Sequence, residues 1–218
     1  MPHRPRIGAF VVPRTDGVAT VIDALEQRSE REIGILRAAY HVMGREGSNR
    51  LNLQAIADEA GISKGLILYH FNTKSAVLQH AMEWALLQTE KRIRNALNGS
   101  RGRHMLADVL DAIFISPQAN REFQMVYLDL IEASVRDDSF AELPGITRAI
   151  VEGLYAEVIQ TGVDSGDLAV DDVADAARRM RVVIDGVLLL WLQRSDWKSS
   201  HGKVKQECLE MLHRLLSA

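Results

Sequence analysis

The chain has 218 residues, 47% hydrophobic and 25% charged, a balance that is typical of a globular protein and excludes a disordered or fibrous chain. Its single cysteine, Cys208, excludes an internal disulfide framework and a cysteine zinc cluster. The formal net charge is −3, with +2 on residues 1–75 and −5 on residues 76–218, so a partner made of phosphates would have to bind a local basic patch.

The apolar runs are too short to cross a membrane. The longest, "VVIDGVLLLWL" at residues 182–192, is interrupted by Asp185, whereas a transmembrane helix needs about 20 apolar residues. The N-terminus has Arg4 and Arg6 before a brief apolar run, but no long hydrophobic region and no small-residue cleavage site. We therefore expect a cytoplasmic protein without a membrane span or a targeting signal.

Residues 1–27 are interpreted as an N-terminal extension. Arg4, Arg6 and Arg14 make a basic arm that is able to lie in a minor groove of DNA, but a disordered tail and a second dimer contact are equal alternatives. A helix is expected next, in "SEREIGILRAAYHVMGREG", where apolar residues recur at spacings of three and four and Gly47 ends the pattern.

The following stretch, "LNLQAIADEAGISKGLILYHFNTKSAVLQHAM" at residues 51–82, predicts two short helices joined by a tight turn. Asn52 is a good N-cap for the first helix, and Ser63 for the second. Between them, Gly61 permits the positive φ of the turn, and Ile62 fills the space between the helices. Each position has its own steric reason, so the combination strongly indicates a DNA-binding helix-turn-helix.

Helices are expected along the rest of the chain as well. A long helix should begin after Thr73, an N-cap candidate, and end at "NGSRG". Gly, Pro, Asp and Ser separate the later apolar patterns, which predict helices at residues 103–116, 118–136, 145–163, 171–195 and 202–217. Strand signals are scarce. The predicted fold is therefore all-α, with about nine or ten helices.

From about residue 30 to residue 82 the sequence resembles the TetR family of bacterial transcriptional regulators. The resemblance rests on "IADEAGISKG", on "YHF", and on Lys74 just past the next N-cap. It implies a three-helix DNA-binding domain at 28–75, followed by a helical ligand-binding and dimerisation domain at 76–218. It also implies a homodimeric repressor that binds palindromic, double-stranded operator DNA and is released by a small, largely apolar molecule.

The second short helix should be the recognition helix in the major groove. Lys64 is expected to contact guanine or phosphate, and Gly65 allows a close approach of the backbone, whereas Tyr69 is either a phosphate contact or a partly buried spacer. Family members often carry Thr and Tyr where this chain has Leu66 and Leu68. The predicted DNA-binding residues are Arg50, Asn52, Gln54, Ser63, Lys64, Gly65, Tyr69, His70 and Lys74.

Aromatic and apolar residues in the second part of the chain predict a ligand pocket. Asp185 has to be solvated, paired with Arg181 one turn earlier, or bonded to a ligand, because it lies within an apolar run. The pocket candidates are Trp84, Phe114, Phe123, Tyr127, Tyr155, Met180, Asp185 and Trp191.

The two C-terminal helices carry broad apolar surfaces. They are expected to pack against the same pair in a second chain as a four-helix interface, and the alternative is burial within one chain. The dimer candidates are Leu188, Leu192, Val204, Cys208, Met211, Leu212 and Leu215.

No motif of the sequence predicts a catalytic centre, a metal site or a cofactor. The histidines lack the spacing of metal ligands, and no phosphate-binding glycine loop is present. An enzyme is therefore not expected. The alternative function is a helical protein-interaction module that keeps the fold without binding specific DNA, which the apolar Leu66 and Leu68 would favour.

Overall fold

The computed structural model describes residues 27–47, 52–99 and 104–216. These residues form α-helices and one short 3-10 helix, and they contain no strand, so the predicted all-α fold is confirmed. The helices are α2 (Glu30–Glu46), α3 (Leu53–Ala60), α4 (Lys64–Phe71), α5 (Lys74–Gly99), α6 (Met105–Ile113), α7 (Pro117–Arg136), α8 (Leu143–Asp164), α9 (Val173–Leu192) and α10 (Trp197–Leu216).

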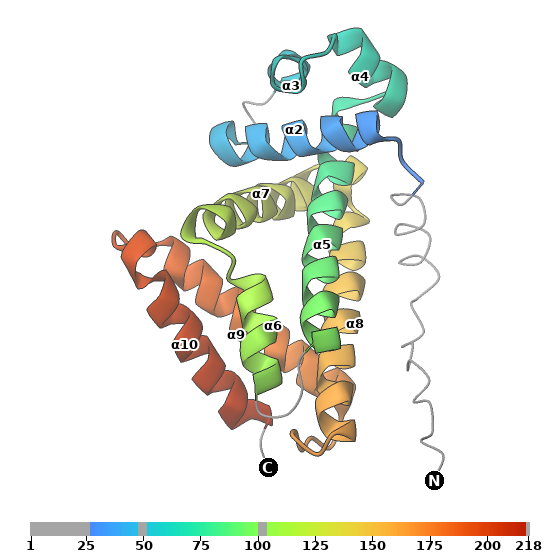
Figure 1. The fold of residues 1–218 in the computed structure, drawn as a ribbon. Helices are drawn as coiled ribbons and strands as arrows, with labels where there is room; N and C mark the ends of the chain where they lie inside the picture. Colours follow the sequence, from blue (N-terminus) through green and yellow to red (C-terminus); the bar gives the residue numbers. More distant parts are fainter. Residues whose placement is uncertain (1–26, 48–51, 100–103, 217–218) are drawn as a thin grey trace.

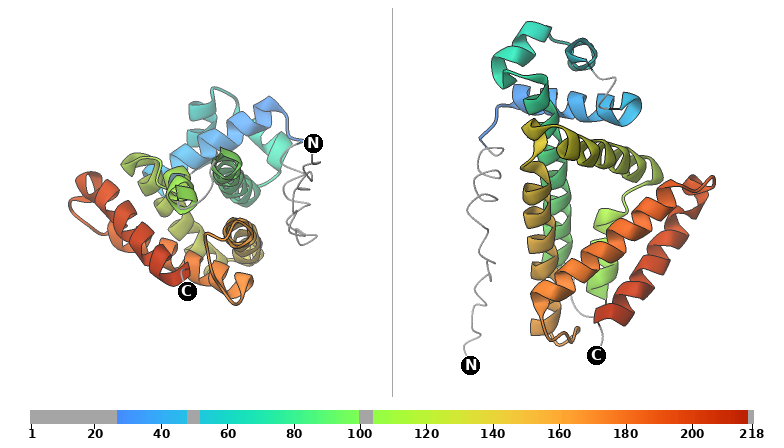
Figure 2. Two further views of the ribbon diagram at one scale, coloured as in Figure 1. Left: turned by 60° about the horizontal axis from the view of Figure 1, so that its bottom comes forward. Right: turned by 180° about the vertical axis from the view of Figure 1, so that it is seen from behind.

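The helices are divided between two ends of an elongated molecule, which α5 connects (Figure 1). Helices α2, α3 and α4 lie together at one end, and α7 runs beneath α2. Helices α5 and α8 lie side by side along the molecule, while α6, α9 and α10 gather at the other end (Figure 2). Because α5 has 26 residues, one rigid element reaches from the helix-turn-helix into the second part of the chain.

Local capping explains where the N-terminal helices begin. Ser29 and Glu32 form a capping box at the start of α2, with the Glu32 amide 3.3 Å from Ser29 Oγ and the Ser29 amide 2.9 Å from Glu32 Oε2. The predicted cap at Thr73 is confirmed, since its Oγ1 accepts a hydrogen bond from the Ala76 amide at 3.1 Å. Gly47 follows the last residue of α2, as the sequence predicts.

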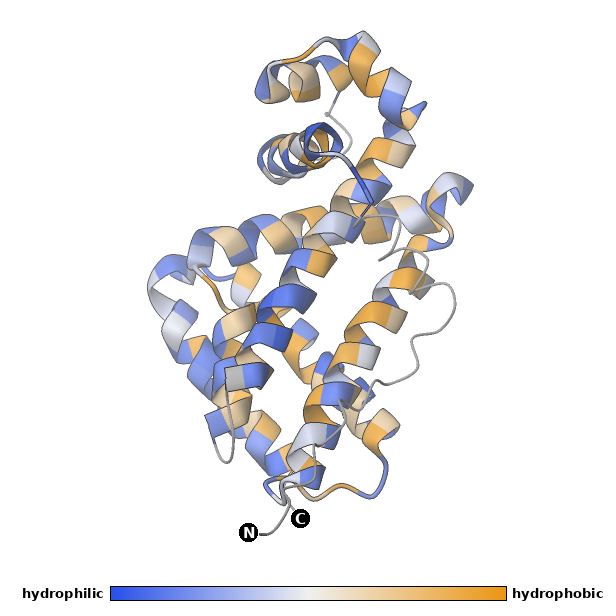
Figure 3. Cartoon of the chain, turned by 45° about the vertical axis from the view of Figure 1, so that its right-hand side comes forward, coloured by the Kyte–Doolittle hydropathy of each residue, from blue (hydrophilic) through white to orange (hydrophobic). Residues whose placement is uncertain are grey.

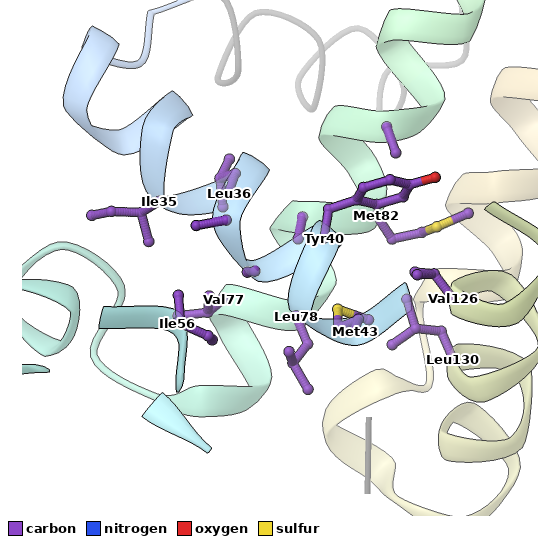
Figure 4. Close-up of a cluster of buried hydrophobic side chains, with 14 of the residues drawn as sticks. Ile35, Leu36, Tyr40, Met43, Ile56, Val77, Leu78, Met82, Val126 and Leu130 are labelled. Atoms are coloured by element: carbon purple, nitrogen blue, oxygen red, sulfur yellow. The ribbon is translucent and has the colours of Figure 1, made fainter. Parts of the chain in front are cut away.

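The first apolar core joins the helix-turn-helix to the long helices. It contains the buried faces of α2, α3 and α4, together with the first half of α5 and residues of α7 and α8. Figure 4 shows Tyr40 and Met43 of α2 near Met82 of α5 and near Val126 and Leu130 of α7. Since this core crosses residue 75, the division at 75/76 stays a prediction about function and does not mark a break in packing.

A second apolar core fills the other end of the molecule, between α6, α8, α9, α10 and the second half of α5. Hydrophobic and hydrophilic residues alternate along these helices (Figure 3), and the residues of this core are hydrophobic. Cys208 is fully buried in this core, and burial raises the pKa of its thiol to about 12. In this core Cys208 packs as a small apolar residue.

The predicted start of the last helix at residue 202 is wrong, because α10 begins at Trp197. The turn before it is confined to a few residues, where the Arg194 guanidinium donates to both carboxylate oxygens of Asp196 at 2.8 and 2.9 Å. Trp191 then fixes the first turn of α10, since its Nε1 donates to the Trp197 carbonyl at 2.7 Å. These tertiary contacts make a helix of "WKSSHG", whose Ser and Gly residues favour a loop.

Gly162 and Gly153, both in α8, give a matched test of this packing. A Cβ at Gly162 would lie 2.5 and 2.6 Å from Leu168 side-chain atoms, whereas a Cβ at Gly153 would have no atom within 4 Å. We expect Gly162→Ala to lower the free energy of unfolding by about 1–3 kcal/mol through overpacking. Gly153→Ala should raise it by about 0.5–1 kcal/mol, because alanine favours the helix. Urea denaturation of both variants measures the difference, and equal stabilities would contradict the packing described.

Candidate DNA interface and ligand cavity

The helix-turn-helix is built by local interactions that the sequence predicts. The Ala55 amide donates to Asn52 Oδ1 at 2.9 Å at the start of α3, and the Leu66 amide donates to Ser63 Oγ at 3.2 Å at the start of α4. Gly61 between them has φ 66° and ψ 34°, the left-handed conformation that a residue with a Cβ rarely adopts. The turn is therefore short and fixed at both ends.

One face of α4 is available to a partner. Ile67 and Phe71 are buried against the core, while Lys64, Gly65 and Tyr69 are exposed. The Tyr69 side chain is 80% exposed, which excludes the alternative of a partly buried spacer. The neighbouring Leu68 is 37% exposed. The lysine, glycine and tyrosine exposed on α4 suit a surface that approaches DNA closely.

The remaining predicted DNA-binding residues differ in their surroundings. Gln54 is exposed and donates from Nε2 to Asp58 Oδ1 at 2.8 Å. His70 turns toward α2, with Nδ1 3.8 Å from Glu32 Oε1 and a side chain only 19% exposed, so it is less open to a phosphate than expected. Lys74 is partly exposed in the first turn of α5, where free amides also favour an anion. Arg50 lies outside the described residues.

A cavity of about 340 Å³ lies between α5, α7, α8 and α9. Five predicted pocket residues line it, namely Trp84, Phe123, Tyr127, Tyr155 and Asp185. Its volume is within the range of small-molecule sites. Its wall also contains Tyr40 and His41, which belong to α2 of the helix-turn-helix part and were not predicted. An amphipathic pattern identifies the buried side of α2, but it does not show which residues of that side meet a cavity.

The Asp185 carboxylate is paired with Arg181 at the cavity wall, which is one of the three alternatives predicted from the sequence. Arg181 donates from Nε to Asp185 Oδ2, from Nη1 to Glu152 Oε1 and from Nη2 to Tyr127 Oη, at 3.2, 3.2 and 3.1 Å. Burial raises the pKa of Asp185, and Arg181 opposes this shift. The guanidinium thus holds two carboxylates and a phenol in one cluster.

A second polar cluster joins α2 to α7 at the cavity. His41 Nδ1 lies 2.7 Å from Glu122 Oε1. Helix α2 approaches α7 closely here, since a Cβ at Gly44 would be only 2.3 Å from Glu122 Cγ. Burial and the Glu122 charge raise the pKa of Tyr40, whose ring packs edge-on to Trp84 with centroids 6.0 Å apart. Histidine, carboxylate and aromatic groups of three helices therefore meet at this corner.

Comparison with known proteins now places the chain in a family. Residues 35–81 match the family described as "Bacterial regulatory proteins, tetR family", and residues 102–217 match "BetI-type transcriptional repressor, C-terminal". The chain belongs to the TetR family of bacterial transcriptional regulators. The resemblance stated from the helix-turn-helix residues is confirmed, and so is the function of a DNA-binding transcriptional regulator.

Individual relatives agree with the family over most of the chain. The HTH-type transcriptional regulator TtgR of Pseudomonas putida is 25% identical over 197 residues, which cover 83% of this chain and 89% of TtgR. The regulator BetI of Stenotrophomonas maltophilia is 26% identical over 163 residues, covering 74% of this chain and 79% of BetI.

Two solved structures share the fold. A transcriptional regulator from Saccharomonospora viridis in complex with choline has a TM-score of 0.74 and 22% identity, covering 88% of this chain and 100% of its own. A complex of SmeT with triclosan has a TM-score of 0.68 and 20% identity, covering 87% and 93%.

Three predicted pocket residues of this TetR-family chain do not line the cavity. Phe114, Met180 and Trp191 are buried in the second apolar core instead. Trp191 is held there by its bond to the Trp197 carbonyl and by edge contacts with the rings of Trp197 and His201. Apolar residues of one helix divide between core and cavity according to their direction, which the periodicity of the sequence does not resolve.

Four predicted dimer residues are also corrected. Leu188, Val204, Cys208 and Leu212 are buried within the chain itself, so they are not available to a second copy. Leu192 and Leu215 are partly buried against the second core, and Met211 is exposed. Helix α9 exposes other large apolar side chains, which the sequence analysis does not predict. They are Val182, Leu189 and Leu190.

Within the parts of the chain that the structure describes, no group of His, Cys, Asp and Glu has the arrangement of a metal site. None of the described helices combines the length and apolar character needed to cross a membrane.

Ser63 allows its capping role to be separated from contact with DNA. Ser63→Ala should lower the free energy of unfolding by about 1 kcal/mol, because the first turn of α4 loses its acceptor. Ser63→Asp should keep this stability, since aspartate is an equally good N-cap, yet weaken DNA binding by repelling phosphate. Denaturation and DNA titration of both variants test this. Unchanged DNA affinity in Ser63→Asp would place the residue outside the interface.

Proposed function

We propose that the chain is a homodimeric repressor, which binds a two-fold symmetric operator through α4 and leaves it when a small molecule enters the cavity. The observation that carries this proposal is the wall of the cavity itself. Tyr40 and His41 of α2 line it, so a ligand would touch the helix against which α3 packs and which shares a core with α4. No catalytic activity is part of the proposed function.

The proposed DNA contacts use the exposed face of α4 and the start of α5. Lys64, Gly65 and Tyr69 would enter or border the major groove, and Ser63 and Lys74 would approach phosphates at two helix N-termini. Asn52 and Gln54 at the start of α3, with Arg50 before it, would contact the backbone on the other side. Two copies would read half-sites about one helical turn apart.

The proposed dimer interface is the exposed apolar surface of α9 and α10. Val182 and Leu190 are 71% and 68% exposed in the single chain, and Leu189 and Met211 are also exposed. Isolated apolar side chains are common on protein surfaces, but several on one pair of packed helices support an interface. Leu192 and Leu215 would contribute their exposed edges. The symmetry of such a dimer matches that of a palindromic site.

The ligands bound in the two related structures differ in chemistry. Choline and triclosan, the ligands in the two related structures, are a cation and a phenol, so the shared fold accommodates different chemistries. The aromatic rings of Trp84, Phe123 and Tyr127 support a ligand with a substantial apolar body here.

Binding to a DNA library in a salt series tests the function, with Lys64→Ala as the informative variant. The protein should select a two-fold symmetric site, with an affinity that falls steeply as salt rises. Lys64→Ala should reduce the salt slope by about 1 if Lys64 binds phosphate, or relax specificity at one base pair by about 1–3 kcal/mol if it binds guanine.

Lys91→Ala is the matched control, because it removes the same charge from an exposed position in the middle of α5. It should leave the operator affinity within about twofold of the parent value. Weak binding without sequence preference, unchanged by Lys64→Ala, would instead favour the protein-interaction module.

The route from cavity to DNA is tested at the contact between α2 and α7. Gly44→Ala places a Cβ on the Glu122 side chain, which must move away from His41. Helix α2 should then shift relative to α7, and operator affinity should fall roughly tenfold, or about 1.4 kcal/mol. Gly34→Ala is the control, because a Cβ at this position of the same helix would meet nothing within 4 Å.

Titration with operator DNA measures the affinity of the two variants, and circular dichroism verifies that they are folded. A folded Gly44→Ala protein with the operator affinity of Gly34→Ala would contradict a route through this contact.

A further inference from the structure

Arg92 of α5 is a charged residue at the cavity that the proposed function has not used. Its Nε donates to the Ala112 carbonyl at 3.2 Å, and its Nη2 donates to Thr89 Oγ1 at 2.8 Å. Both acceptors are neutral. Arg92 also lies close enough to Tyr40 for the two groups to influence each other's pKa. A guanidinium carries five N–H donors, so these two bonds leave part of its edge without an acceptor.

The other charged side chains at the cavity already have partners of opposite sign. Arg181 is paired with Asp185 and Glu152, and Glu122 with His41 at 2.7 Å when the imidazole is protonated. Glu90 is paired with Arg94 at 2.9 Å, and Arg94 also binds Glu157. Among the described residues, Arg92 has no carboxylate within the 4.0 Å of an ion pair. Burial lowers its pKa, with no carboxylate contributing to the shift.

An uncompensated cation in a partly enclosed, mostly apolar site is costly unless a ligand supplies the opposite charge. Arg92 and Tyr40 both line the cavity, together with the aromatic side chains of Trp84 and Phe123, and the rings of Tyr40 and Trp84 are in edge contact. A planar guanidinium edge matches a carboxylate, which accepts two parallel hydrogen bonds. The single positive charge matches one carboxylate group.

We propose that the effector is an amphipathic carboxylate whose anionic group binds Arg92 beside Tyr40, with its apolar body against Trp84 and Phe123. This inference rests on the proposed function, because it names the ligand class of the same cavity. In this proposal the role of Arg92 is to select anionic ligands over cationic ones. It also places the ligand head group next to α2, where Tyr40 and His41 reach the cavity.

A purely structural role of Arg92 would lead to a different prediction. The Ala112 carbonyl belongs to the last turn of α6, and a cation at a helix C-terminus stabilises that helix. If this were the whole contribution of Arg92, its replacement would lower thermal stability without changing which head group binds. The selectivity of ligand binding for the head group therefore distinguishes the two roles of Arg92, whereas thermal stability does not.

The experiment uses two ligand series in isothermal titration calorimetry with the 218-residue chain. One series is phenylbutyrate, phenylbutanol and phenylbutylammonium, and the other is octanoate, octanol and octylammonium. Within each series only the head group differs. Wild-type protein should bind the carboxylate of at least one series about tenfold to a hundredfold more tightly than its alcohol. The ammonium compounds should bind no more tightly than the alcohols.

Three variants complete the test. Arg92→Met should remove the preference for carboxylate over alcohol, while Arg92→Lys should retain part of it because the charge remains. Lys91→Met is the control for net charge, since Lys91 is the preceding residue of α5 and is exposed. It should keep the wild-type preference. Circular dichroism verifies that each variant is folded.

Several results would overturn the proposal. They are equal or tighter binding of the ammonium compounds by the wild type, a carboxylate preference that survives Arg92→Met, and no binding of either carboxylate. Operator binding without ligand is measured on the same samples. Its absence would refute the repressor function, whereas operator binding without carboxylate selectivity would refute only the assignment of the ligand class.

Discussion

The apolar contact between α2 and α5 is the constraint on which the other features depend. Leu36, Tyr40 and Met43 of α2 are buried in the same core as Val77, Leu78 and Met82 of α5 (Figure 4). Burial of each large side chain contributes roughly 1.5–3 kcal/mol, so the helix-turn-helix does not move freely on α5. Any displacement of α5 by a ligand must carry α2, or else open this core.

The same contact explains why α2, which belongs to the helix-turn-helix end of the molecule, forms part of the cavity wall. Tyr40 is buried in the first core and also lines the cavity, where its ring contacts that of Trp84. Gly44 lets α2 lie close to Glu122 of α7, and His41 then closes a polar contact across the gap. The cavity and the helix-turn-helix thus both contact α2, so the coupling needs no relay through distant residues.

Much of the helix-turn-helix could be predicted from sequence because its determinants are local. Asn52, Gly61 and Ser63 each act on a backbone group within a few residues, so spacing alone fixes their roles. The cavity depends instead on which sides of six helices converge. Phe114 and Trp191 were predicted to line it but pack in the core, while Tyr40 and Arg92 reach it without any signal in their own segments. Four of the predicted dimer residues are buried within the chain for the same reason, since an apolar stripe indicates burial but not the partner that buries it.

Charge compensation then decides what the cavity is able to bind. Desolvation penalises every ion at its wall, and for most of them a neighbour of opposite sign offsets that penalty before any ligand arrives. A cationic ligand would have to compete with Arg181 for Asp185, or with His41 for Glu122, so part of its binding energy would be spent on breaking an existing contact. An anion at Arg92 would add a partner and break none of the observed ion pairs. Aromatic rings favour an apolar body in either case, and the unequal compensation of the wall charges therefore determines the preferred sign of the ligand head group.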